Sequence, residues 1–204
     1  MALRGCLDRG ELDGHVVEDL LRSIPPGPND AAGSVVAEFL RSGSADTLGA
    51  ALFALAGLWG ERARPLLFGA LGHVGPVVVV SAIAGLRVLR AIDTHVVAKL
   101  DTILTGNAAM TEEARVEAAT ALGEAAPEAR NAAATIATRA FSPPPRAARW
   151  SSPPPNASPE LTVALARSLL ALRVPNAAVM IQQRASASPD VVRHQLAALI
   201  PSRG

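Results

Sequence analysis

Residues 111–141 read TEEARVEAATALGEAAPEARNAAATIATRAF and hold the pattern from which the architecture of the whole chain can be predicted. In the first half, apolar residues recur at the spacing of one helix face, at Ala114, Ala118, Ala119 and Leu122. Gly123 follows where the end of a helix favours a residue tolerant of positive φ, and Pro127 begins a second helix. The segment therefore predicts two helices joined by a tight turn.

The same helix pattern recurs along the chain at intervals of 31, 36, 47 and 31 residues. Each copy starts at an anchor residue that is followed at +3, +4 and +7 by apolar residues, the anchors being Leu48, Val79, Arg115, Thr162 and Arg193. A period in the thirties with two helices per repeat is the signature of an α-solenoid. We therefore predict an all-α fold, a right-handed α-solenoid of about five to six antiparallel helix pairs, forming a single domain over residues 1–204.

Further helices are expected wherever apolar residues keep helical spacing between breakers. These segments are 12–24, 29–40, 45–59, 61–71, 77–89, 93–104, 161–172, 176–184 and 191–200. Either Asn29 or Asp30 can cap the second of them, and either Asp93 or Thr94 the sixth. Four valines at 77–80 favour a strand by propensity alone. The spacing of the apolar residues between 79 and 86 and the helical neighbours predict a helix there instead.

Residues 142–158, SPPPRAARWSSPPPNAS, interrupt the repeats. Proline cannot donate the hydrogen bonds of a helix, so we expect an extended, proline-rich loop inserted between repeats. Two triple-proline runs flank Arg146, Arg149 and Trp150. Trp150 either folds back to seal the gap between repeats or is an exposed anchor for a partner, in keeping with the enrichment of Trp and Arg at binding hot spots.

Composition narrows the class of protein. The net charge is +1, so the chain as a whole has no strong attraction to nucleic acid or to a membrane surface. Cys6 is the only cysteine, which leaves no intrachain disulfide, and the longest apolar run, 74–86, is too short to span a bilayer. Lys99 is the only lysine, and this preference for arginine is typical of a GC-rich bacterial genome. We expect a soluble, cytoplasmic protein.

Two segments resemble a known repeat family. Residues 113–124, EARVEAATALGE, closely resemble the first helix of HEAT repeats, and residues 190–199, DVVRHQLAAL, are a looser copy. Armadillo-like repeats are the alternative within the same type of solenoid. The resemblance implies a curved stack whose second helices line the concave side and usually bind another macromolecule, and it implies no chemistry.

The patterns that mark catalytic and metal sites were sought as well. The four histidines are isolated in the sequence, with no HExxH and no pair at i, i+4, and no P-loop or nucleophile elbow occurs. The paired carboxylates Glu112 and Glu113 stand at a helix N-terminus, where the helix dipole favours negative charge. We therefore expect no catalytic residue, no metal site and no cofactor.

The sequence predicts a non-enzymatic scaffold that binds a partner protein through its concave helices and the proline-rich loop. The expected partner-binding residues are Arg62, His95, Lys99, Arg130, Asn131, Arg146, Arg149, Trp150, Gln183 and Arg184. The alternative is a nucleic-acid binder resembling the HEAT-like DNA glycosylases, which need a cationic groove and aromatic side chains. The apolar residues of the last helix leave both a monomer and a homodimer open.

Overall fold

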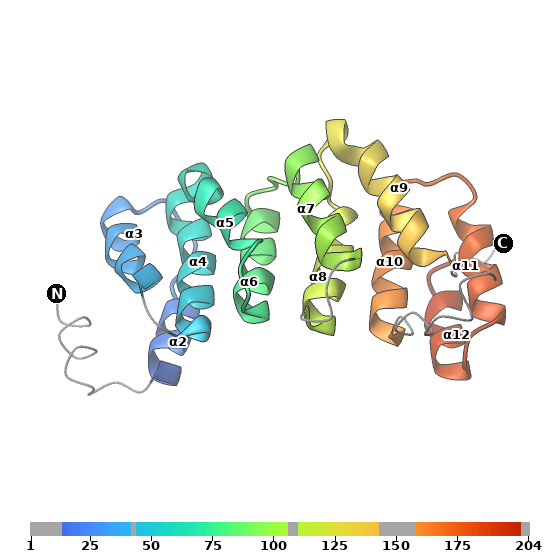
Figure 1. Cartoon of the computed structure of the whole chain (residues 1–204), viewed down its shortest axis with the longest axis horizontal. Coiled ribbons are helices and arrows are strands. Elements are labelled where there is room, and N and C mark those ends of the chain that lie inside the picture. The colour runs from blue at the N-terminus through green and yellow to red at the C-terminus, as the bar shows by residue number, and fades with distance from the viewer. Residues whose placement is uncertain (1–13, 42–43, 106–109, 143–157, 201–204) are drawn as a thin grey trace. The chain divides into compact units, whose positions relative to one another are not determined.

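A computed structural model describes residues 14–41, 44–105, 110–142 and 158–200 of the chain. These residues form helices joined by short turns, with no β-strand among them, which confirms the all-α prediction (Figure 1). The chain forms two compact units, unit 1 over Met1–Ala91 and unit 2 over Ile92–Gly204. Each unit has its own buried core, and each is described in turn.

Unit 1 is built around one central helix. Its helices are α2 (Gly14–Arg22), α3 (Asp30–Ala37), α4 (Ala45–Trp59), α5 (Arg64–Ala70) and α6 (Pro76–Val88), with 3-10 turns at Glu38–Arg41 and Gly60–Ala63. Helix α4 packs against α2, α3 and α6, and its side chains are buried on nearly all sides. This is why α4 is apolar all round, as the sequence indicated.

Local capping fixes where the helices of unit 1 begin. Asn29 caps α3, because its Oδ1 accepts a hydrogen bond from the Ala32 N–H at 2.9 Å. This settles the choice between Asn29 and Asp30. The expected helix at 61–71 was only partly right, because its first turn is the 3-10 turn Gly60–Ala63 and α5 begins at Arg64.

The four valines lie in α6, so the prediction of a helix is confirmed. Pro76 occupies the first turn, where its missing N–H costs no hydrogen bond. Val78, Val79, Ile83 and Leu86 are fully buried. Packing of this apolar face against α4 and α5 therefore outweighs the β-propensity of the valines.

Small residues bring α4 and α6 close together. A Cβ on Gly49 of α4 would lie 2.8 Å from Ser81 Oγ of α6, and a Cβ on Gly85 would lie 3.3 Å from Ala56 Cβ. Residues early in α4 thus meet residues early in α6, and late residues meet late ones. The two helices therefore run parallel, with α5 between them in the chain.

Unit 2 contains six further α-helices in its described residues. They are α7 (Thr94–Thr105), α8 (Glu112–Leu122), α9 (Arg130–Phe141), α10 (Pro159–Ala171), α11 (Ala177–Ser186) and α12 (Asp190–Ala197), and a 3-10 turn at Pro127–Ala129 precedes α9. Three N-termini carry a side-chain cap. Asp93 accepts from Val96 N–H, Thr111 from Ala114 N–H and Ser158 from Leu161 N–H. Asp93, rather than Thr94, is therefore the cap of α7.

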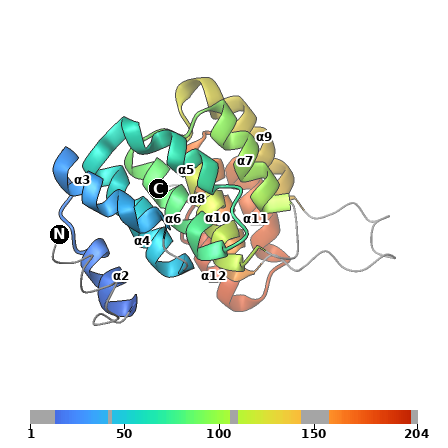
Figure 2. The same ribbon diagram turned by 60° about the vertical axis from the view of Figure 1, so that its left-hand side comes forward.

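Alternate helices of unit 2 pack side by side in the same direction. The Ala126 N–H donates to Ile92 O at 2.8 Å just before α9 and α7 begin, and Arg139 pairs with Asp101 further along both helices. Helices α7 and α9 are therefore parallel neighbours (Figure 2). Helix α10 packs in the same way between α8 and α12 (Figure 1).

The repeated apolar positions form the core of both units. At the copies anchored on Leu48, Val79, Arg115 and Thr162, all the residues at +3, +4 and +7 are buried. The copy anchored on Arg193 differs, because Leu196 is buried whereas Ala197 is exposed. Helix α12 ends at Ala197, short of the predicted end at residue 200. The repeat spacing thus identifies the buried faces of α4, α6, α8 and α10.

One local expectation was wrong. Gly123 has φ −63°, so the end of α8 needs no positive φ. The glycine instead permits close packing, because a Cβ there would lie 3.1 Å from Ser168 Oγ and 3.2 Å from Ser168 Cα. At the start of α12, the N-cap position is Pro189 and no side chain caps the helix. Ser188 instead donates its hydroxyl hydrogen bond back to Arg184 O.

Candidate functional site

The predicted partner-binding residues fall in different parts of the structure. Arg62 belongs to unit 1, whereas His95, Lys99, Arg130, Asn131, Gln183 and Arg184 belong to unit 2. Residues 143–157 lie outside the described part of the chain, and with them Arg146, Arg149, Trp150 and most of the predicted loop.

Arg62 is already engaged within unit 1. Its Nη1 lies 2.5 Å from Asp30 Oδ1, and its guanidinium carbon lies 5.4 Å from the centroid of the Trp59 ring. The pair links the turn after α4 to the first residue of α3. Arg62 is exposed, so both contacts are solvent-screened and contribute little to stability.

Four predicted residues lie on two neighbouring helices of unit 2, and we term them together the α7–α9 surface: His95, Lys99, Arg130 and Asn131. All four are exposed. His95 and Lys99 are one turn apart on α7, and Arg130 and Asn131 open α9. Because the two helices are parallel neighbours that start at the same end, the first turn of α9 lies beside the first turns of α7.

An ion pair holds the far end of this surface. Arg139 of α9 hydrogen-bonds and pairs with Asp101 of α7. The hydrogen bond from Arg139 and the negative charge of Asp101 both raise the pKa of Arg139. Arg139 is exposed, so solvent screens the pair and it contributes little to stability.

Gln183 and Arg184 lie on α11, which packs against α12 and α10. Gln183 is exposed and Arg184 is partly buried. The Arg184 carbonyl accepts the hydroxyl hydrogen bond of Ser188, and this contact helps to end the helix. The packing of α11 against α10 and α12 therefore positions these two residues.

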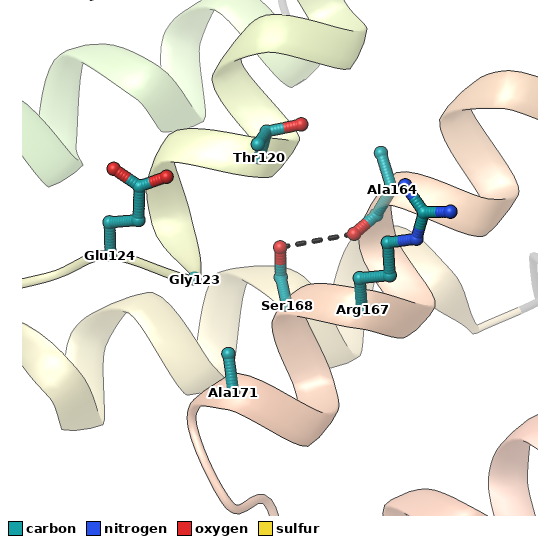
Figure 3. Close-up of a pocket in the computed structure, with 7 residues that line it drawn as sticks. All are labelled: Thr120, Gly123, Glu124, Ala164, Arg167, Ser168 and Ala171. Carbon is teal, nitrogen blue, oxygen red and sulfur yellow. Dashed lines mark hydrogen bonds between the residues drawn. The ribbon is translucent and has the colours of Figure 1, made fainter. Parts of the chain in front are cut away.

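A groove that the sequence did not predict lies on the other layer of unit 2. Two adjoining hollows, of about 420 Å³ and about 190 Å³, share Thr120, Ala164 and Arg167. We refer to them together as the α8–α10–α12 groove, of which Figure 3 shows the smaller hollow, between α8 and α10. Its remaining lining residues are Val116, Gly123, Glu124, Glu160, Val163, Ser168, Ala171, Gln195, Ala198 and Leu199.

The groove exists because the helices around it carry small residues. Gly123 of α8 and Ser168 of α10 let the two backbones approach closely. Ser168 Oγ, which is buried, donates to Ala119 O of α8 at 2.5 Å and lies 3.1 Å from Ala164 O of its own helix. The hydroxyl thereby satisfies a carbonyl in the last turn of α8 and fixes α10 against it.

Arg167 lines both hollows and is a candidate functional residue that the sequence analysis did not name. The apolar spacing of α10 marks the buried positions Leu165, Ala166 and Leu169, and Arg167 lies on the exposed side of the same helix. A signal was present in the sequence, since Ala164 and Ala171 stand one turn before and one turn after Arg167. The side chains of Ala164 and Ala171 are small, so they leave open space beside the long side chain of Arg167 on the same helix face (Figure 3).

Three further observations complete the description. Within the ranges that the structure covers, no group of three or more His, Cys, Asp or Glu side chains is placed to hold a metal ion. None of the helices described has the length and apolar character that crossing a membrane requires. In comparisons with known proteins, no family model, no curated protein and no solved structure matches this chain.

Proposed function

We propose that this chain is a non-enzymatic adaptor that binds another protein through the α7–α9 surface, and that its helix pairs are HEAT-like solenoid repeats. The repeat proposal is supported by the packing within each unit. Helices α4 and α6 run parallel, and so do α7 and α9, each pair separated by one intervening α-helix. Successive equivalent helices of an α-solenoid have this relation.

The observation that carries the binding proposal is the set of exposed polar groups on the neighbouring helices α7 and α9. His95, Lys99 and Arg130 offer positive charge or hydrogen-bond donors, and Asn131 offers both a donor and an acceptor. None of the four takes part in an ion pair within the described ranges, so a partner can engage them without breaking an internal contact. Such a surface favours a partner with exposed carboxylates and backbone carbonyls.

The proline-rich segment supplies a second proposed anchor, on the ground of its sequence. Trp150 with Arg146 and Arg149 combines the residue types most enriched at binding hot spots. We propose Gln183 and Arg184 of α11 as peripheral contacts of the partner protein. Gln183 is exposed and Arg184 is partly buried, so the two residues add few interactions to those of the α7–α9 surface.

Site-specific photo-crosslinking tests the proposal. A photoreactive amino acid placed at Lys99 or at Asn131 should crosslink one specific protein in cells of the native host, whereas the same group at Ser34 of unit 1 should not. The double variant Lys99→Glu/Arg130→Glu should remove this crosslink, because it reverses the charge of the surface. The matched variant Arg41→Glu changes an exposed arginine of unit 1 and should leave the crosslink intact. Equal crosslinking at all three positions would argue against this surface.

A further inference from the structure

We propose that the α8–α10–α12 groove binds a short segment of a partner protein that carries a carboxylate between apolar side chains. This inference rests on the proposed function and deepens it. It adds a second binding surface to unit 2 and names the chemistry of the segment that fits there.

Arg167 places a positive charge in the middle of the groove, and this charge favours a carboxylate in the bound segment. Arg167 lines both hollows and is exposed. Its guanidinium has no ion pair or hydrogen bond with any residue that the structure describes. An arginine presents a planar fork of donors, which a carboxylate can match with two parallel hydrogen bonds. A carboxylate of the partner segment is therefore the group that best completes this site.

The apolar floor of the groove favours apolar side chains on either side of the carboxylate in the bound segment. Val163 and Ala164 of α10 are buried, and Val116 of α8 and Leu199 after α12 are partly exposed to the hollow. Covering this surface removes apolar area from water, which favours binding. Apolar side chains on either side of the carboxylate can lie on these residues while the carboxylate reaches Arg167.

The ends of the groove restrict the pattern further. Glu160 lies seven residues before Arg167 on α10, about 10 Å along the helix, and Glu124 lies beyond the end of α8. The negative charge of Glu160 disfavours negative charge at that end of the bound segment. The expected segment therefore has an acidic residue at its centre and a neutral or basic residue at the end that lies beside Glu160.

The shape of the groove favours a peptide segment over a small molecule. Both hollows are open to solvent rather than enclosed, and the larger measures about 420 Å³. Small-molecule sites usually bury most of their ligand. A groove that crosses neighbouring helices and combines an apolar floor with a central charge instead resembles the sites that hold peptide segments.

A peptide selection on the full-length chain tests the proposal. The probe is a phage-displayed library of random 16-residue peptides, panned on the immobilised full-length protein. We expect the retained peptides to share a central Asp or Glu between apolar residues. Synthetic copies should bind the Arg167→Glu variant at least about tenfold more weakly than the unchanged chain, because charge-assisted hydrogen bonds are replaced by repulsion.

Matched variants separate the groove from general effects on the fold. Ala198→Trp fills the groove at an exposed position and should weaken binding to a similar degree. Ala178→Trp makes the same change at an exposed position of α11, and Arg173→Glu reverses an exposed charge that does not line the groove. Both should leave the affinity within about twofold of the unchanged chain, and circular dichroism checks that each variant is folded.

Three results would overturn the inference: no enrichment, enriched peptides without the central acidic residue, or peptides whose affinity survives Arg167→Glu and Ala198→Trp. The same peptides, measured on Lys99→Glu/Arg130→Glu, distinguish the two proposals. Peptides lost on that variant but retained on Arg167→Glu would leave the α7–α9 surface standing and remove the groove. The crosslinking experiment tests the α7–α9 surface independently.

Discussion

The contact between α8 and α10 depends on one buried hydroxyl. Ser168 Oγ donates to Ala119 O across the interface, and both atoms are shielded from water. We expect Ser168→Ala to lower the free energy of unfolding by about 1–2 kcal/mol, because the carbonyl in the last turn of α8 loses its partner. Urea unfolding followed by circular dichroism measures the change. Ser186→Ala removes an exposed hydroxyl that bonds only within its own helix and should change stability by less than about 0.5 kcal/mol.

Gly123, which lies against Ser168, is needed because a side chain would not fit there, and not because of its backbone φ angle. Gly123→Ala should destabilise the chain by about 1 kcal/mol or more, because the new Cβ meets the Ser168 backbone at 3.2 Å. Gly69→Ala is the matched change, since nothing lies within 4 Å of its Cβ position, and it should stabilise the chain by about 0.5–1 kcal/mol. Two changes of the same sign in urea unfolding would contradict this assignment.

At the scale of the elements, α6 and α10 end in the same way, with an arginine where helices usually place glycine. Arg90 and Arg173 have φ of 54° and 55°. At each helix end, the N–H of the residue after the arginine donates a hydrogen bond to a carbonyl five residues earlier. Ala91 N–H donates to Leu86 O, and Val174 N–H donates to Leu169 O, as in a Schellman motif. The left-handed conformation is unfavourable for arginine, so both helix ends carry local strain.

This strain predicts a gain from glycine. Arg173→Gly should raise the free energy of unfolding by about 0.5–1 kcal/mol relative to Arg173→Ala, since both variants lose the side chain and only glycine relieves the positive φ. Urea unfolding of the two variants side by side measures the difference. If the alanine variant is as stable as the glycine variant, the end of α10 is not strained as described.

At the scale of the whole molecule, each unit has its own core. In unit 2, Leu122, Leu165 and Leu169 are almost fully inaccessible to solvent, and they come from helices that pack within that unit. We therefore expect residues 92–204, expressed alone, to show a helical circular dichroism spectrum and one cooperative urea transition. A fragment of residues 112–204 lacks α7 and its buried Val97 and Leu100, so it should unfold at lower urea. A disordered spectrum for residues 92–204 would show that unit 2 does not fold independently.

Most of the fold could be predicted because the signals for helix ends are local. Ser44 caps the helix that ends at Trp59, and Pro76 begins α6. Repeated apolar spacing then identified which side of each helix is buried. The candidate site could be predicted less well. His95 and Lys99 could be proposed from the sequence because helical spacing places them on an exposed face, and their role stays a prediction. The hollow beside Arg167 could not be predicted, because three helices form it together.

By itself, the sequence determined where the helices lie and which of their faces form the core, since capping groups, prolines and apolar spacing act over a few residues. Only the tertiary structure decided which residues the small side chains contact and where they leave a groove. Gly123 serves close packing because Ser168, 45 positions later, lies against it, and Arg167 stands in a groove because Val116 and Leu199 come from the helices on either side. Contacts between residues so far apart in the chain depend on how helices pack, and no local pattern encodes that.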